Sequence, residues 1–181
     1  MNTTTRWAVV FLCATAGFAA GCSGGSGDAF RPPDVLDGER KLDPDFATTL
    51  AIKDATGQFR DTFSPGEQVV FELTITNLRD RAIIVTRGSG QIFDFLVAPA
   101  GTRDIVWRQS AGFLFAQVIE HDEFAAHETR TYSVNWDQDR DDGLPLLPGE
   151  YVARGVYSAV GSGFEFQQSE FGSELIPFAI R

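Results

Sequence analysis

Cysteine, histidine and methionine are scarce in this 181-residue chain. It has two cysteines, two histidines and one methionine. Both cysteines, Cys13 and Cys22, lie close to the N-terminus, so no disulfide can cross-link the rest of the chain. Two histidines without further cysteines rarely form a closed zinc site. These shortages leave stability to hydrophobic packing and favour no metal centre or other cofactor.

An excess of positive charge is also absent. The chain has 15 basic and 25 acidic residues, which gives a formal net charge of -10. Binding to nucleic acid and adsorption to anionic lipid head groups both require clustered positive charge. We therefore expect no nucleic-acid partner, and we interpret the acidity mainly as a source of solubility.

The folded part of the chain lacks the patterns typical of nucleophilic catalysis. Residues 44–181 contain neither a G-x-S-x-G elbow nor a cysteine close to a histidine. Ser89 and Ser162 each stand in a Gly-Ser-Gly triplet, which serves turns more often than catalysis. His121 and His127 are six residues apart in a polar stretch that we expect to be an exposed loop. A hydrolase is the least favoured function, and we expect no enzyme activity.

Phenylalanine and glycine are abundant, with 16 and 18 residues. Many aromatic residues, many turn formers and few helix formers favour an all-β domain. Short runs alternate between apolar and polar residues and are bounded by turn signals, most clearly at 68–77. Strands are expected at 46–53, 68–77, 82–86, 91–97, 105–107, 129–136, 151–157 and 174–181, and 113–120 is ambiguous between a strand and a helical turn. Seven to nine such strands, about 8–12 residues apart, predict an immunoglobulin-like antiparallel β-sandwich over residues 44–181.

The segment from Gly90 to Arg108 is expected to be the hairpin around which the domain is organised. Phe93 and Phe95 alternate with other residues along its first half, and Trp107 belongs to its second half. A Pro/Gly turn separates the two halves. Large aromatic side chains dominate the core of a small domain, so we interpret this hairpin as structural.

An acidic stretch runs from Asp137 to Gly143. Its alternating carboxylates resemble the beginning of a calcium loop, because such oxygens can surround a hard cation. An EF-hand would place glycine at the position of Asp142 and glutamate at that of Pro148. A solvated acidic turn is the favoured interpretation, and a weak calcium site is the alternative.

The stretch from Ser158 to Ser173 is predicted to be an insertion that binds a partner. It spreads Phe164, Phe166 and Phe171 through a segment rich in glycine and serine. Aromatic side chains without a core partner tend to mark contact sites. The alternative is a hairpin whose phenylalanines pack back onto the sandwich.

The N-terminus has the layout of a secretory signal peptide. Met1 to Gly21 contains one basic residue, then an apolar run, then small residues. The sequence from Ala19 to Cys22 resembles the lipobox of bacterial lipoproteins, although that family most often has leucine at the position of Ala19. This resemblance implies that Cys22 is lipidated and anchors the protein to a membrane. A plain secretory signal is the alternative.

The expected organisation is therefore a signal peptide over residues 1–21, a flexible tether over 22–43 and the folded domain over 44–181. Glycine and serine at the start of the tether and two prolines within it favour a spacer that holds the domain off the bilayer. The expected location is the bacterial cell envelope, facing the periplasm or the exterior.

Several motifs of the folded part resemble the BsuPI-type intracellular proteinase inhibitor domain over about residues 50–157. The resemblance rests on their order and spacing: SPGE at 64–67, LTITN at 73–77, GQIFDF at 90–95, VWR at 106–108, Phe115, Tyr132, WD at 136–137 and LPGEY at 147–151. It implies an immunoglobulin-like sandwich and a serine protease as a partner. It carries over no reactive-site residue.

Two functions follow from these patterns. The first is an extracytoplasmic proteinase inhibitor in which a loop such as 158–173 or 137–148 occupies the protease cleft. The second is a non-inhibitory envelope interaction or assembly lipoprotein. Both are protein-binding modules that perform no chemistry.

Overall fold

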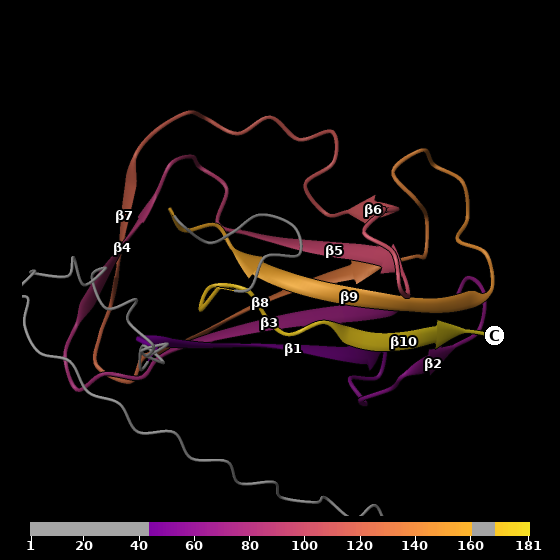
Figure 1. Cartoon of the computed structure of the whole chain (residues 1–181), viewed down its shortest axis with the longest axis horizontal. Helices are drawn as coiled ribbons and strands as arrows, with labels where there is room; N and C mark the ends of the chain where they lie inside the picture. The colour runs from indigo at the N-terminus through magenta and orange to yellow at the C-terminus, as the bar shows by residue number, and fades with distance from the viewer. Residues whose placement is uncertain (1–43, 161–168) are drawn as a thin grey trace, which may run out of the picture. The chain divides into compact units, whose positions relative to one another are not determined.

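The computed structural model describes residues 44–160 and 169–181, which contain ten β-strands and no helix (Figure 1). The strands are β1 (Phe46–Asp54), β2 (Thr62–Phe63), β3 (Val69–Asn77), β4 (Ile83–Arg87), β5 (Phe93–Pro99), β6 (Trp107–Arg108), β7 (Glu120–Phe124), β8 (Thr129–Trp136), β9 (Gly149–Tyr157) and β10 (Ile176–Ile180). These residues belong to a compact unit, Leu42–Arg181.

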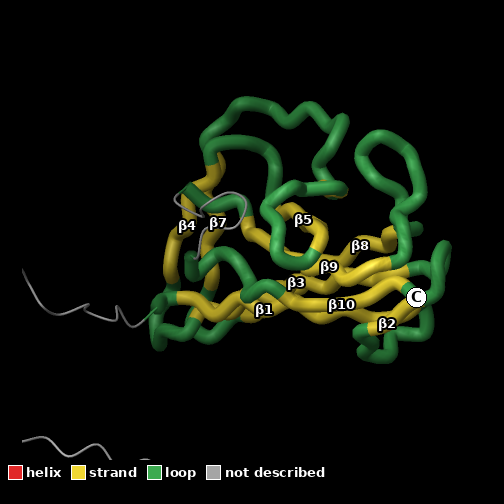
Figure 2. The backbone as a smooth tube through the Cα atoms, turned by 45° about the vertical axis from the view of Figure 1, so that its right-hand side comes forward, coloured by secondary structure: helices red, strands yellow, loops and turns green. Residues whose placement is uncertain are grey.

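Two sheets pack face to face, and a two-stranded pair lies at one end of them. One sheet has the order β1-β3-β8, the second has the order β2-β10-β9-β5-β6, and β4 pairs with β7. All neighbours are antiparallel except β2 and β10, which are parallel. Figure 2 shows the β4–β7 pair at the end of the sandwich. The predicted fold class, an immunoglobulin-like antiparallel β-sandwich, is confirmed.

The strand count exceeds the predicted seven to nine. The strands missing from the prediction are β2 and β7. β2 has only two residues, and β7 is mostly polar, so neither shows an alternating apolar pattern in the sequence. The longer strands follow their patterns closely. Val69, Phe71, Leu73 and Ile75 of β3 all point inward and are fully buried, because side chains alternate between the two faces of a strand.

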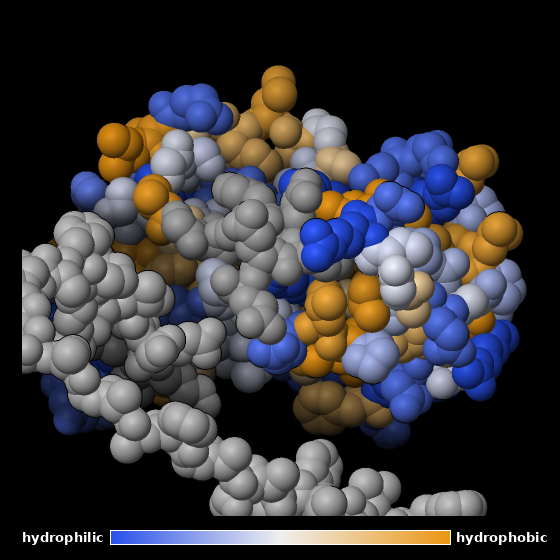
Figure 3. Space-filling view, viewed as in Figure 1, coloured by the Kyte–Doolittle hydropathy of each residue, from blue (hydrophilic) through white to orange (hydrophobic). Residues whose placement is uncertain are grey.

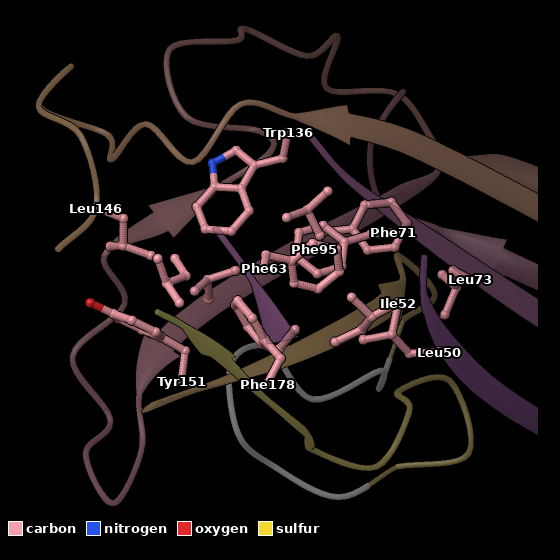
Figure 4. Close-up of a cluster of buried hydrophobic side chains, with 14 residues drawn as sticks. Leu50, Ile52, Phe63, Phe71, Leu73, Phe95, Trp136, Leu146, Tyr151 and Phe178 are labelled. Atoms are coloured by element: carbon pink, nitrogen blue, oxygen red, sulfur yellow. The ribbon is translucent and has the colours of Figure 1, made fainter. Parts of the chain in front are cut away.

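Phe71 lies at the centre of the main core (Figure 4). Its ring is stacked on those of Phe95, Trp107 and Trp136 at centroid distances of 5.9, 5.8 and 5.6 Å. Phe178 of β10 meets it edge-on at 6.2 Å. Offset-stacked and edge-on contacts add to the stabilisation from buried area. The core therefore joins both sheets through one aromatic cluster.

A tyrosine fixes the bend into β9. The Tyr151 hydroxyl donates a hydrogen bond of 2.7 Å to the backbone carbonyl of Leu147, four residues upstream. Sandwiches of the immunoglobulin type use a tyrosine corner of this kind. Pro145 and Pro148, which lie in this connection, have no backbone N–H and so reduce the number of backbone donors in it.

The predicted hairpin between Gly90 and Arg108 forms, with Leu96 opposite Arg108 and Val97 opposite Trp107. It does not occupy the centre of its sheet, because β9 does and β6 is the edge. Its first strand is also buried on both faces: Asp94 and Leu96, on the face opposite Phe95, are each 3% exposed. The alternating pattern alone does not reveal a strand covered on both sides.

The prediction for 113–120 was wrong in both of its forms. Residues 109–119 form a long connection between β6 and β7, and only Glu120 belongs to a strand. Its apolar residues are consecutive, in a run at 113–116 and a pair at 118–119, which does not match the alternating period of a strand with one face toward a core. We call residues 109–119 the β6–β7 loop.

The predicted signal peptide, tether and lipidated Cys22 lie outside the described residues, as do Phe164 and Phe166. Within residues 44–160 and 169–181, no helix is long and apolar enough to cross a membrane.

Candidate functional site

The β6–β7 loop is the most exposed apolar segment that the structure describes. Leu114 is 100% exposed, Phe113 is 62% exposed and Ile119 is 70% exposed. Figures 1 and 2 show the loop arching away from the sandwich between β6 and β7. Clusters of exposed apolar residues mark contact sites more often than singly exposed apolar residues do.

A buried carboxylate holds the N-terminal end of this loop. Asp94 of β5 accepts a 2.6 Å hydrogen bond from the Ser110 hydroxyl and a 3.1 Å bond from the Ser110 backbone N–H. The Gln109 N–H also donates to the Phe95 carbonyl at 3.0 Å. Burial raises the pKa of the Asp94 carboxyl, and the hydrogen bonds from Ser110 partly oppose that rise.

The loop turns at Gly112, and a hydrogen bond from Gly90 then holds it at Ala116. Gly112 has a φ of 79°, a left-handed conformation that glycine adopts without strain. The Gly90 N–H donates to the Ala116 carbonyl at 2.9 Å, and a side chain on Gly90 would meet Ala116 at 3.8 Å. The exposed residues 111–114 therefore lie between two anchored points.

The acidic stretch is organised by a glutamine. Gln138, 1% exposed and at a φ of 65°, bonds through its side-chain amide to the backbone of the turn at 64–67. Its neighbours diverge: Asp137 accepts from Gln68, Asp141 accepts from the Arg108 N–H, and Asp142 pairs with Arg140. No group of three or more potential metal ligands converges anywhere in the described residues.

The two histidines lie apart and on the surface. The His121 ring contacts the Thr86 hydroxyl at 3.2 Å across the β4–β7 pair. His127 lies in a turn at a φ of 58° and contacts the Asp80 carboxylate at 2.8 Å. Each ring therefore has a separate local partner. The expectation of an exposed loop holds for His127 but not for His121, which belongs to strand β7 and pairs with Thr86 of β4.

Of the three phenylalanines predicted to bind a partner, the structure describes only Phe171. It is half-buried and packs on Phe46 and Tyr157 at centroid distances of 5.3 and 6.4 Å. This is the alternative in which the phenylalanines pack back onto the sandwich, and it holds for Phe171. Phe164 and Phe166 lie outside the described residues, so a binding role for them stays a prediction.

A buried ionic cluster joins the β4–β7 pair to the main sandwich. Arg87 of β4 pairs with Asp122 of β7 at 2.5 Å, and the Tyr157 hydroxyl donates to the same carboxylate at 2.6 Å. Burial alone would raise the pKa of Asp122, but hydrogen bonds from Arg87 and Tyr157 lower it overall. The groups satisfy one another, which indicates a structural role.

A groove of about 540 Å³ lies between β1 and the β2–β10 edge. Phe59, which is 75% exposed, stands on one side of it, and Ile176 and Pro177 stand on the other. Figure 3 shows an apolar patch in the region of β1 and β10. Arg60, Asp61 and Thr62 also line the groove, which therefore combines apolar and polar side chains suited to contact with another chain.

The fold and these surfaces define a β-sandwich with exposed apolar loop residues. The family comparison is more specific: residues 59–161 match the family of BsuPI, intracellular proteinase inhibitor. The match covers more than half of the chain, and the chain belongs to this family. The expected resemblance is thereby confirmed at the level of the inhibitor domain. None of the curated proteins matches the chain significantly.

Solved structures resemble the chain only distantly. The β-glucosidase EmGH1 from Erythrobacter marinus is 11% identical, with a TM-score of 0.42 over 75% of this chain and 15% of the enzyme. A β-glucosidase from Listeria innocua is 12% identical, with a TM-score of 0.37 over 74% of this chain and 16% of the enzyme. The CARDB domain of the PF1109 protein from Pyrococcus furiosus, in complex with di-metal ions, is 12% identical, with a TM-score of 0.40 over 76% of this chain and 89% of that domain. Likenesses at this level say nothing about activity, substrate or bound metal.

Sequence reasoning missed the β6–β7 loop as a candidate site. It placed the contact loop at 158–173 or 137–148. Two signals were available in the sequence. One is the run Phe113-Leu114-Phe115 directly after a glycine, and the other is Asp94 in the middle of a strand that is otherwise rich in apolar residues. A buried aspartate needs partners, and Ser110 supplies them here.

Proposed function

We propose that this chain is a lipid-anchored inhibitor of a serine proteinase in the bacterial cell envelope. Its membership of the proteinase-inhibitor family carries the proposal, because the matched residues 59–161 span β2 to β9 and include the whole β6–β7 loop. The exposed loop on a rigid sandwich supports this function, since inhibitors bind through segments that are ordered before contact.

Titration of the full chain against subtilisin-like, chymotrypsin-like and trypsin-like proteases tests the inhibitory part. A sharp 1:1 end point, with the chain still intact, is the expected result for at least one of them. Full protease activity at excess chain would contradict it.

The envelope location rests on the sequence of the N-terminus. The match of Ala19–Cys22 to a lipobox supports an anchor on Cys22, and more than one acyl chain gives stable membrane attachment. Cys22→Ala should release the protein from the membrane fraction or leave it uncut. Cys13→Ala is the matched control and should stay anchored, because Cys13 lies within the signal peptide. Unchanged partitioning of Cys22→Ala would overturn the anchor.

The second candidate is a non-inhibitory envelope module that holds another protein. The groove between β1 and the β2–β10 edge favours it, because an exposed Phe59 beside an apolar strand edge suits an extended peptide. Under this function, Phe59→Ser would abolish capture of an envelope protein by crosslinking and no protease would be inhibited. Under the inhibitor function, Phe59→Ser would leave the titration end point unchanged.

A further inference from the structure

We propose that Leu114, at the exposed tip of the β6–β7 loop, is the residue that enters the primary specificity pocket of the target protease, and that this pocket is apolar. The inference rests on the proposed inhibitory function and deepens it, because it names the contact segment and the class of protease. Four observations carry it.

The first observation is exposure. Leu114 is 100% exposed and follows Phe113, which is 62% exposed. Figure 3 shows hydrophobic side chains projecting at the edge where Figure 1 draws the connection between β6 and β7. Leaving a leucine in water forgoes the stabilisation that its burial would give. The free energy becomes available when a partner covers the side chain, as at interface hot spots.

The second observation is the backbone of the loop. Residues 113–119 contain no helix, strand or turn. Among the described residues, no backbone hydrogen bond involves the N–H or the carbonyl of Leu114. Backbone groups that are not used within the chain can pair with the backbone of a partner. The loop therefore offers both a side chain and a backbone for recognition.

The third observation is that the tip is held from both sides. Asp94 fixes Ser110 through two hydrogen bonds, and Gly90 fixes Ala116 through one. Burial of a carboxylate is unfavourable unless hydrogen bonds compensate for its lost hydration. The two hydrogen bonds that Ser110 donates to Asp94, one from its hydroxyl and one from its backbone N–H, lie at the base of this loop. Ordering before contact reduces the entropy lost on binding.

The fourth observation is the chemistry of the loop, which selects the protease class. Residues 111–119, AGFLFAQVI, include no charged side chain. A pocket with an aspartate at its base, as in trypsin, needs a basic residue, and a small pocket of the elastase type excludes leucine. A hydrophobic slot of the chymotrypsin type accepts leucine. The loop therefore fits a protease with an open apolar pocket.

The competing loop at 137–148 fits less well. It closes on itself through a bridge between Asp139 and Pro145, and Gln138 ties it to the turn at 64–67. Leu147, which is 69% exposed, stands in this loop between Leu146 and Pro148. It supplies a matched control, because it is also an exposed leucine but lies on a different loop.

The experiment compares the inhibition constants of the full chain, Leu114→Arg and Leu147→Arg against chymotrypsin, subtilisin and trypsin. The wild-type chain should inhibit chymotrypsin or subtilisin. Leu114→Arg should weaken that inhibition by about 30-fold or more, as loss of an interface hot spot does, and should gain inhibition of trypsin. Leu147→Arg should match the wild type. Because both leucines are exposed, unfolding temperatures should be the same for all three.

The outcomes separate the two proposals. If the wild-type chain inhibits and Leu114→Arg inhibits equally well without gaining trypsin inhibition, the assignment of Leu114 is overturned while the inhibitory function stands. If the wild-type chain inhibits none of the three proteases, the inhibitory function and the assignment both fail. Rapid cleavage after Leu114 with full protease activity would make the loop a substrate and overturn the assignment.

Discussion

Asp94 shows how one buried charge positions an exposed surface. Its carboxylate is 3% exposed, and the Ser110 hydroxyl and N–H both donate to it. A buried carboxylate is tolerated only where hydrogen bonds compensate for lost hydration. The residue therefore stabilises a single conformation at the start of the β6–β7 loop.

Ser110→Ala should destabilise the domain by about 1–3 kcal/mol, because it leaves the Asp94 carboxylate without its side-chain donor. Denaturant unfolding measures the loss. Ser133→Ala on the exposed face of β8 is the matched control and should change the free energy of unfolding by less than about 0.5 kcal/mol. Equal effects of the two substitutions would contradict the role given to Ser110.

Tyr157 should make the domain sensitive to alkaline pH. Burial, followed by its hydrogen bond to Asp122, raises the pKa of this phenol well above its ordinary value of 10.0. Above pH 10 the unfolded chain loses the phenolic proton and the folded chain keeps it, so the free energy of unfolding falls as pH rises. Burial also raises the pKa values of Tyr132 and Tyr151, which add to this slope.

Tyr157→Phe should reduce the slope of the free energy of unfolding against alkaline pH by the equivalent of about one bound proton. The part of the slope that Tyr132 and Tyr151 contribute should remain. It should also lower stability at neutral pH, because Asp122 loses a donor. Chemical unfolding at a series of pH values measures both effects. An unchanged slope would show that Tyr157 ionises in the folded state as it does in the unfolded chain.

At the scale of elements, the close approach of β9 to β3 depends on a glycine. A Cβ added to Gly155 would lie 2.7 Å from the Leu73 Cδ1 and 3.3 Å from its Cβ. Leu73 is fully buried and has no room to move. The two sheets are therefore in contact at this point through the backbone of β9 itself.

Gly155→Ala should destabilise the domain by about 1–3 kcal/mol through overpacking. Gly88→Ala is the matched control, because a Cβ at Gly88 would meet nothing within 4 Å. Thermal unfolding compares the two variants. A wild-type unfolding temperature for Gly155→Ala would contradict the tight packing between β9 and β3.

Most strands were predictable from the sequence, but the two-residue β2 and the polar β7 were not. β3 alternates cleanly, because one of its faces meets the core and the other meets solvent. β5 is buried on both faces, so Asp94 was not recognised as a buried residue. The β6–β7 loop was misread because an apolar run that serves binding has the same composition as one that serves a core.

At the scale of the whole molecule, the acidic sandwich carries the exposed apolar β6–β7 loop. The net charge of -10 suits solubility, and strong aromatic packing provides stability without disulfides in the folded unit. The inhibitor family was recognisable from ordered turn and strand motifs. Its contact residue was not, because exposure and anchoring depend on distant residues such as Asp94 and Gly90 meeting the loop.

The most direct test of the inhibitory function is native mass spectrometry of the full chain mixed with an equimolar amount of chymotrypsin and, in a second sample, of subtilisin. In at least one sample we expect a complex that contains one protease and one chain, with the chain at its uncut mass after hours of incubation. Fragments of the chain, or an unbound intact chain, without any such complex in both samples would contradict the account.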